Sequence, residues 1–322
     1  MKKVIFDTDI GIDDAMALLF LHYSPNVALQ GIVSGFGNAD IDTTTRNALY
    51  LKQRFGIGAP VFRGAGAPLG PRLGDDYPDF VHGKNGLGDI EINEPAEKAE
   101  AAAGFEAIID IVKQQPNEIS IVAVGRLTNL ALALAQCPEL PSLVKEIIVM
   151  GGAFGSNGHR GNVSPVAEAN IAGDPLAADQ VFTAGWPITI VGLDVTHETI
   201  LDEAFFESVR DAGGDAGKLI HQISRCYLDF HERIHRKREC PMHDSSAVAC
   251  LLAPSLFTTQ AAAVRVATEG VAIGQTIAGD AAAEYASTAW QGKPACQVCT
   301  AVDADQVLDL YLKTLSLAGD QA

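Results

Sequence analysis

Four carboxylates lie within eight residues near the start of the chain: Asp7, Asp9, Asp13 and Asp14, in residues 4–15 (VIFDTDIGIDDA). Like charges this close repel one another, so a folded protein keeps them together only where something positive or hydrogen-bonding lies between them. A hard cation that takes several oxygen ligands, such as calcium, suits that place. An acidic helix N-terminus would explain Asp13 and Asp14, but it would leave Asp7 and Asp9 unexplained. The cluster therefore indicates a site.

The elements on either side of the cluster place it at the edge of a sheet. Residues 3–6 have the apolar pattern of a buried strand, and residues 15–23 carry apolar side chains at helical spacing. The acids therefore fall on a strand-to-helix turn at the carboxyl end of the strand, which is where open α/β sheets bind ligands. We expect Gly11 to give this turn the backbone freedom that it requires.

Strand and helix patterns alternate along the rest of the chain, which predicts an α/β fold with a central, mainly parallel (mixed) sheet flanked by helices. We expect one domain over residues 1–322, because no repeat, low-complexity tract or long Pro/Ser linker interrupts the pattern. The further predicted strands are 29–33, 119–124, 146–150, 188–191 and 296–302, and the further predicted helices are 43–55, 105–114, 130–135, 175–183 and 307–315.

Two segments depart from this alternation. Residues 63–89 are rich in Gly and Pro and show little periodicity, which predicts a long loop, and long loops in compact domains are often functional lids. Residues 218–238 read as a long helix that ends in a basic stretch. Because cations are favourable at a helix C-terminus, we interpret that stretch as a solvated helix end.

Composition and charge exclude several classes of protein. A net charge of −17 argues against a nucleic acid as partner, since binding to a phosphate backbone relies on cationic contacts. No apolar run approaches the roughly 20 residues that span a bilayer, and no secretory signal is visible. We therefore expect a cytoplasmic protein that neither binds nucleic acid nor enters a membrane.

Cysteine usage points the same way. Six cysteines in 322 residues do not make a disulfide scaffold. Cys296 and Cys299 have the spacing of a redox or zinc pair, but no second pair accompanies them and they lie in a strand-like run, so a structural role is favoured. We interpret the remaining four as small buried apolar residues: Cys137, Cys226, Cys240 and Cys250.

Polar residues also follow the later predicted strands. They occur in residues 34–38 (SGFGN), 122–129 (VAVGRLTN), 161–170 (GNVSPVAEAN) and 241–249 (PMHDSSAVA). Taken singly, each segment is also compatible with an ordinary loop or a helix cap. Taken together, they put polar groups at the sheet edge that carries the acid cluster. The side chains concerned are Asn38, Asn162, Glu168, Asn170, His243 and Asp244.

Residues 7–15 (DTDIGIDDA) closely resemble the amino-terminal signature of the inosine-uridine-type nucleoside hydrolases, which cleave the N-glycosidic bond of ribonucleosides around a bound calcium ion. The later segments match that family in the same order up to about Asp244, including its Asn…Glu-x-Asn pattern. The resemblance implies a nucleoside-hydrolase-like Rossmann variant, a small-molecule ribonucleoside as substrate, and a homodimer or homotetramer. Ala169 departs from the family, which often has a large aromatic residue there.

The resemblance also implies a role for each matching residue. Asp9 would be the general base towards the attacking water, and His243, near the nucleobase, would supply its proton. Residues 82–88 (HGKNGLG) resemble the mobile loop that closes over nucleosides, and His231 and His235 are further candidates near the base. The implied calcium ligands are Asp9, Asp14, Asp244 and the backbone carbonyl of Val124. The implied substrate-binding residues are Asp13, Asn38, His82, Met150, Asn162, Glu168, Asn170 and Tyr227.

Two other functions stay open at this point. Residues 4–9 (VIFDTD) also resemble the opening of haloacid-dehalogenase-type phosphatases, in which the first Asp is the nucleophile and the ion is magnesium. That interpretation gives no role to the second Asp pair or to the later polar segments. A calcium-dependent nucleoside binder without activity would use the same residues as a hydrolase. Preference for purine or pyrimidine bases does not follow from the sequence.

Overall fold

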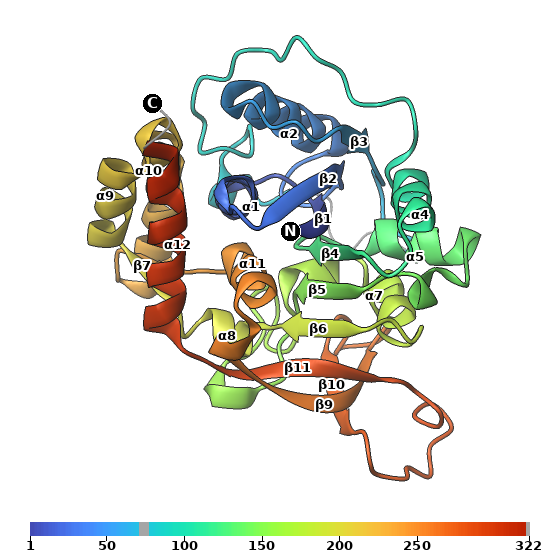
Figure 1. The fold of residues 1–322 in the computed structure, drawn as a ribbon. Helices are drawn as coiled ribbons and strands as arrows, with labels where there is room; N and C mark the ends of the chain where they lie inside the picture. The colour runs from blue at the N-terminus through green and yellow to red at the C-terminus, as the bar shows by residue number, and fades with distance from the viewer. Residues whose placement is uncertain (71–76, 320–322) are drawn as a thin grey trace.

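The structure, a computed structural model, describes residues 1–70 and 77–319. Its strands are β1 (Lys2–Thr8), β2 (Val27–Ser34), β3 (Val61–Arg63), β4 (Ile119–Ala123), β5 (Glu146–Met150), β6 (Ile188–Val191), β7 (Ile200–Asp202), β8 (Glu239–Pro241), β9 (Phe257–Val266), β10 (Thr276–Asp280) and β11 (Ala295–Val302). Nine of the described strands form one mixed sheet in the order β10-β9-β11-β6-β5-β4-β1-β2-β3, and β7 pairs with β8 (Figure 1). Within the large sheet β9 runs antiparallel to both β10 and β11, and the other described strand pairs are parallel.

Helices cover both faces of this sheet. The described α-helices are α1 (Ile12–Tyr23), α2 (Ile41–Phe55), α3 (Asp79–His82), α4 (Gly104–Gln114), α5 (Thr128–Gln136), α6 (Ala169–Gly173), α7 (Pro175–Phe182), α8 (Leu193–Thr196), α9 (Glu203–Ala212), α10 (Gly214–His235), α11 (Asp244–Leu252) and α12 (Ala304–Gly319). Helices α4, α5 and α7 lie on one face, whereas α1 and α11 lie on the other and are themselves covered by α10 and α12 (Figure 1).

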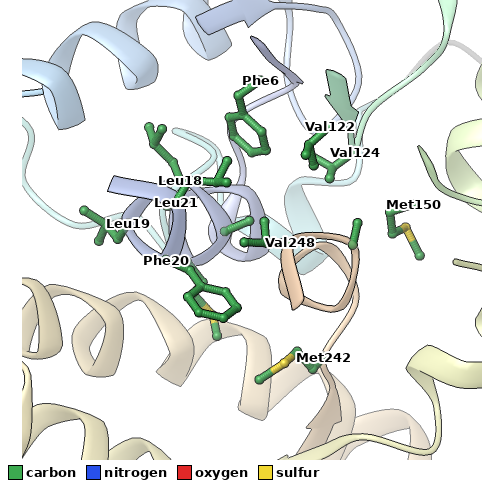
Figure 2. Close-up of a cluster of buried hydrophobic side chains, with 14 of the residues drawn as sticks. Phe6, Leu18, Leu19, Phe20, Leu21, Val122, Val124, Met150, Met242 and Val248 are labelled. Atoms are coloured by element: carbon green, nitrogen blue, oxygen red, sulfur yellow. The ribbon is translucent and has the colours of Figure 1, made fainter. Parts of the chain in front are cut away.

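Alternating side chains of the strands build a separate core on each face. In the inner strand β1, Val4 and Phe6 pack into one core and Ile5 into the other, and all three are fully buried. Parallel strands covered on both faces need apolar residues on both. Figure 2 shows the first core, in which Phe6 lies with Leu18 of α1 and Val248 of α11. Helix α1 is buried along most of its length because it lies between the sheet and the outer helices.

The predicted α/β class with a mainly parallel mixed sheet is confirmed, and every predicted strand and helix is present. Sequence patterns missed the short elements β3, β7, β8, β10, α6 and α8, and they also missed β9 and α9. Strand β9 (FTTQAAAVRV) escaped because residues 258–261 are exposed and carry no apolar alternation. Whether residues 1–322 form a single domain stays a prediction.

The two segments that depart from the alternation are structured in part. Residues 63–89 contain α3, while residues 71–76 of this predicted lid lie outside the described residues. Helix α10 ends before Arg236, whose φ is +62°, and Arg238 then forms ion pairs with Asp229 and Glu232. The basic stretch is therefore a solvated helix end, as expected. No helix in the described part of the chain is long and apolar enough to cross a membrane.

All six cysteines are free. Cys296 and Cys299 pack into the cores on opposite faces of the sheet, so they cannot form a redox or zinc pair with each other. One prediction was wrong: Cys226 is only partly buried, because it lines a surface pocket with Phe80 and Asp89. Its thiol donates a hydrogen bond to the carbonyl of Val81 (3.6 Å).

Candidate active site

The acid cluster forms where the carboxyl end of β1 meets the N-termini of α1 and α11. Asp7 ends the buried part of β1, Asp9 lies in the turn after it, and Asp13 and Asp14 lie in the first turn of α1. Asp244 is the first residue of α11. All are buried except Asp13, which is partly exposed. The fold thus brings together acids that are more than 200 residues apart in the sequence.

Gly11 is required in the turn for a reason other than the expected one. Its φ of −103° is accessible to any residue, so backbone freedom does not explain it. A Cβ atom on Gly11 would instead lie 2.6 Å from Nδ2 of Asn38 and 2.7 Å from Nδ1 of His82. Glycine therefore allows both side chains to approach the acid turn closely.

Asp14 is held by four hydrogen bonds. Its Oδ1 accepts from the Thr8 hydroxyl (2.5 Å) and the Asp9 backbone N–H (3.1 Å). Its Oδ2 accepts from the backbone N–H of Gly11 (2.9 Å) and from Nδ2 of Asn38 (2.7 Å). The hydrogen bond from the Gly11 N–H caps the N-terminus of α1. The alternative explanation of Asp14 as part of an acidic helix N-terminus therefore applies to this one contact. The other three bonds fix the orientation of the Asp14 carboxylate within the cluster.

Asp9 and Asp13 each have a buried oxygen without a hydrogen-bond partner among the described residues, Oδ1 in both cases. The other oxygen of Asp9, Oδ2, accepts from the backbone N–H of Asn38 (2.8 Å). One carboxylate oxygen from each of Asp13, Asp14 and Asp244 lies within 4.8 Å of the others. Unpartnered buried oxygens are costly, and such a set is what a hard cation takes as ligands.

Burial and mutual repulsion raise the pKa of these acids. Burial, followed by the charge of Asp14, raises the pKa of Asp9, and the same two causes raise the pKa of Asp13 to about 8. Burial and repulsion by Asp13 and Asp14 raise the pKa of Asp244 well above its ordinary value. A cation among them would relieve this repulsion. The residues present therefore fit a hard metal cation.

The carbonyl of Val124 lies at the same sheet edge, just after β4. It accepts a hydrogen bond from Nδ2 of Asn170 (2.7 Å), which also donates to the carbonyl of Met150 at the end of β5 (3.2 Å). The Met150 side chain packs into a core (Figure 2). Asn170 thus ties the ends of two neighbouring strands together. The role of Val124 as a metal ligand stays a prediction.

Glu168 and Asn162 make hydrogen bonds to backbone groups. Glu168 caps α6 through the N–H groups of Asn170 (2.9 Å) and Ile171 (3.1 Å), and it also accepts from Gly152 (2.9 Å). Burial raises the pKa of Glu168. Asn162 accepts from the N–H of Ala169 (3.0 Å). Backbone N–H donors therefore already orient the side chains of Glu168 and Asn162. The contacts to ribose hydroxyls that the sequence predicts would be made in addition to these hydrogen bonds.

His243 is buried beside the acids, directly before Asp244. Its Nδ1 forms a hydrogen bond with the Thr196 hydroxyl (2.9 Å), and its ring centroid lies 5.4 Å from that of His197. Burial, followed by the proximity of His197, lowers the pKa of His243 well below its ordinary value. His243 is therefore a neutral imidazole at neutral pH in this environment.

His82 and Tyr227 also lie beside the acid cluster. Nδ1 of His82 accepts the N–H of Ile12 (3.2 Å), and burial lowers the His82 pKa to about 4. The His82 and Tyr227 rings stack with centroids 5.9 Å apart, and His231 packs edge-on against Tyr227 at 4.8 Å. Three residues proposed from sequence as base contacts therefore form one group of rings next to Asp13.

Sequence reasoning missed several residues of the site. Arg126 lies beside Asp9, and a line of rings connects His243 through His197 to His159, which contacts Glu198. Arg126 could have been found, since it is the one charged residue in the segment 122–129. His159 and His197 occur in segments without a recognisable pattern, so only the fold shows that they lie in line with His243.

Comparison with known proteins agrees with this site. Residues 4–309 match the family model described as inosine-uridine preferring nucleoside hydrolase. The chain is 38% identical over 317 residues to uridine nucleosidase 1 of Arabidopsis thaliana, an alignment that covers 97% of this chain and 92% of that protein. This family match gives no support to the phosphatase alternative.

Solved structures agree as well. A plant nucleoside hydrolase, the PpNRh1 enzyme, superposes with a TM-score of 0.94 at 36% identity, covering 98% of this chain and 99% of that one. A purine-preferring ribonucleoside hydrolase from Gardnerella vaginalis superposes with a TM-score of 0.91 at 33% identity, covering all of both chains. The names of these relatives differ in the base that they prefer.

Proposed function

We propose that this chain, which belongs to the family of inosine-uridine preferring nucleoside hydrolases, hydrolyses the N-glycosidic bond of ribonucleosides to ribose and free base with calcium bound at the acid cluster. The observation that carries the proposal is a pair of buried oxygens on Asp9 and Asp13, beside Asp14 and Asp244, that have no hydrogen-bond partner in the described part of the chain. Such a site suits a reaction whose transition state becomes positively charged, because the surrounding carboxylates stabilise that charge.

Calcium would be held by Asp9, Asp14, Asp244 and the carbonyl of Val124. When bound, it would orient the ribose hydroxyls and a water and would increase the acidity of that water. Asp13 also has an oxygen within 4.8 Å of those of Asp14 and Asp244. In the proposal Asp13 instead binds a ribose hydroxyl, which requires its free Oδ1 to face the sugar.

Asp9 is the general base of the proposed reaction. Its Oδ2 is fixed by the backbone of Asn38, while its buried Oδ1 has no partner among the described residues. Oδ1 accepts the proton as the water oxygen bonds to C1′ and the bond from C1′ to the base nitrogen breaks. The electron pair of that bond leaves with the base. Asn162, Glu168 and Asn170 hold the ribose in position during this displacement.

His243 faces the leaving base in this proposal. Because its pKa is lowered, the neutral ring acts first as a hydrogen-bond donor. If Nδ1 accepts from Thr196, the donor is Nε2. This hydrogen bond stabilises the negative charge on the departing base, and His243 can protonate the base only after the ring has itself taken up a proton. The rings of His82, Tyr227 and His231 form a wall for the base, with His235 stacked on His231 at 5.6 Å.

The test is release of free base and ribose from inosine, adenosine, guanosine, uridine and cytidine, followed by chromatography with and without a chelator. We expect base release that the chelator abolishes and that added calcium restores. No release from any nucleoside, in protein shown to contain calcium, would contradict the proposal and favour a non-enzymatic nucleoside binder. The same panel ranks purine and pyrimidine substrates. We further propose a cytoplasmic homodimer or homotetramer, and sedimentation analysis tests the assembly.

A further inference from the structure

We propose that Arg126 is a positioning residue for the catalytic carboxylate of Asp9, an inference that rests on the proposed function of Asp9 as general base. Arg126 follows β4 and precedes α5, and its Nε and Nη1 atoms are fully buried. A permanently charged guanidinium buried among acids is costly unless the acids hold it. Its placement next to Asp9 therefore has a consequence for the reaction.

Two glycines make room for Arg126. A Cβ atom on Gly173, at the end of α6, would lie 1.8 Å from Nε of Arg126. A Cβ atom on Gly37, after β2, would lie 2.7 Å from Nη1 of Arg126 and 1.6 Å from Oδ2 of Asp9. The guanidinium also covers the ring of Phe36, with its carbon 4.6 Å from the ring centroid. The surroundings thus hold the guanidinium in one place.

The same geometry directs Arg126 at one oxygen of Asp9. Nη1 of Arg126 and Oδ2 of Asp9 both lie within 2.7 Å of the point that a Gly37 Cβ would take. Oδ2 also accepts the backbone N–H of Asn38 at 2.8 Å. Oδ2 therefore accepts one hydrogen bond and has the guanidinium of Arg126 nearby. In the proposal these two groups orient the carboxylate so that Oδ1 meets the attacking water.

Charge supports this arrangement. The positive charge of Arg126 attracts the carboxylates of both Asp9 and Glu168. Removal of the guanidinium would remove this attraction, whereas the repulsion between Asp9 and Asp14 would remain. The carboxylate of Asp9 could then rotate. Small displacements of a reacting group cost about 10²-fold in rate. We therefore expect the loss in kcat and not in KM, because Arg126 acts through Asp9 and not through the substrate.

The experiment compares Arg126→Ala with the wild-type enzyme, and uses Arg225→Ala, which removes an exposed arginine of α10, as the control. For Arg126→Ala on the best nucleoside, at saturating calcium, we expect kcat to fall about 10²-fold, with KM within a few-fold. Added guanidinium ion should restore at least a tenth of the lost turnover. Arg225→Ala should behave like wild type in every assay, with or without guanidinium.

A second variant displaces the guanidinium while keeping its charge. Gly173→Ala puts a methyl group against Nε of Arg126, and we expect a loss of kcat in the same direction; Gly58→Ala, where an added Cβ meets nothing within 4 Å, is its control. Arg126→Ala with near-normal kcat would overturn the inference. The inference would also be overturned by a loss of kcat that added guanidinium ion does not restore and that is accompanied by loss of calcium binding or of the fold. Failure of the proposed function is distinguishable, since the wild type itself would then release no base.

Discussion

The two oxygens of Asp9 have different surroundings, and this difference defines the proposed chemistry at the residue scale. Oδ2 is held by the Asn38 backbone and faces Arg126, whereas Oδ1 is buried and has no partner among the described residues. A base needs one free oxygen in a fixed position. Asp14, with four donors, is unsuited to that task.

Asp9→Asn should abolish most turnover without unfolding the protein. The amide keeps the size of the carboxylate but cannot accept the proton of the attacking water, so we expect kcat to fall about 10²- to 10⁴-fold. Steady-state kinetics on the best nucleoside, with circular dichroism to check the fold, measures this. A variant that keeps near-normal kcat would remove Asp9 from the base role.

His243→Ala should impair poor leaving groups more than good ones. An ordinary nucleobase needs a proton or a hydrogen bond to leave, whereas p-nitrophenolate leaves without help, so we expect the kcat/KM loss on inosine or uridine to exceed that on p-nitrophenyl riboside by at least about tenfold. Asp9→Asn serves as the contrast, because it should impair both substrates equally. Equal losses on both substrates for His243→Ala would argue against a role in leaving-group departure.

At the scale of elements, the site depends on how closely the turn after β1 packs against its neighbours. Gly11 is the clearest case. A Cβ atom there would press on both Asn38 and His82 at under 2.8 Å, although the backbone conformation itself would tolerate it.

Gly11→Ala should therefore reduce activity without abolishing folding. The methyl group displaces Asn38, which holds both Asp9 and Asp14, so we expect kcat/KM to fall by at least about tenfold. Gly58→Ala is the matched control, because a Cβ atom added at Gly58 would meet no described atom within 4 Å. Similar kinetics for the two variants would show that the approach of Asn38 does not matter for the reaction.

Much of this arrangement of elements could be predicted from the sequence, and the limits have physical reasons. Strong apolar periodicity identified β1, α1 and five further strands of the large sheet (β2, β4, β5, β6 and β11), and the strand-end position of Asp9 followed from it. Hydrogen-bond partners did not follow, since they depend on packing between distant elements. Arg126, Thr196 and His197 reach the site only because β4, α8 and α11 meet there.

At the scale of the whole molecule, the fold of this acidic chain gathers Asp13, Asp14 and Asp244 where a cation is expected. Buried acids with raised pKa values then link the stability of the metal-free protein to pH. The folded-state pKa is about 7 for Asp7 and about 8 for Asp13, against ordinary values of 3.8, and burial is the main cause for both.

The metal-free protein should lose stability as the pH rises from 6.5 to 8. In this window the folded state holds protons on Asp7 and Asp13 that the unfolded state has released, so unfolding is favoured as the pH increases. Buried His82, with its pKa lowered to about 4 from 6.5, has the opposite effect, but only below pH 6.5. Thermal unfolding of the chelated protein across this window measures the trend. With saturating calcium the trend should weaken, and a constant or rising Tm without calcium would contradict this account.

The most direct test of the central claim, that Asp9 directs a water onto C1′, is the anomeric form of the ribose first released. Direct displacement of the base by water inverts C1′, whereas a covalent intermediate on a carboxylate retains its configuration. Proton NMR during the first turnovers, before mutarotation, distinguishes the two. The account predicts that α-ribose appears first; initial release of β-ribose would contradict it, because the attack on C1′ would then have come from the protein itself.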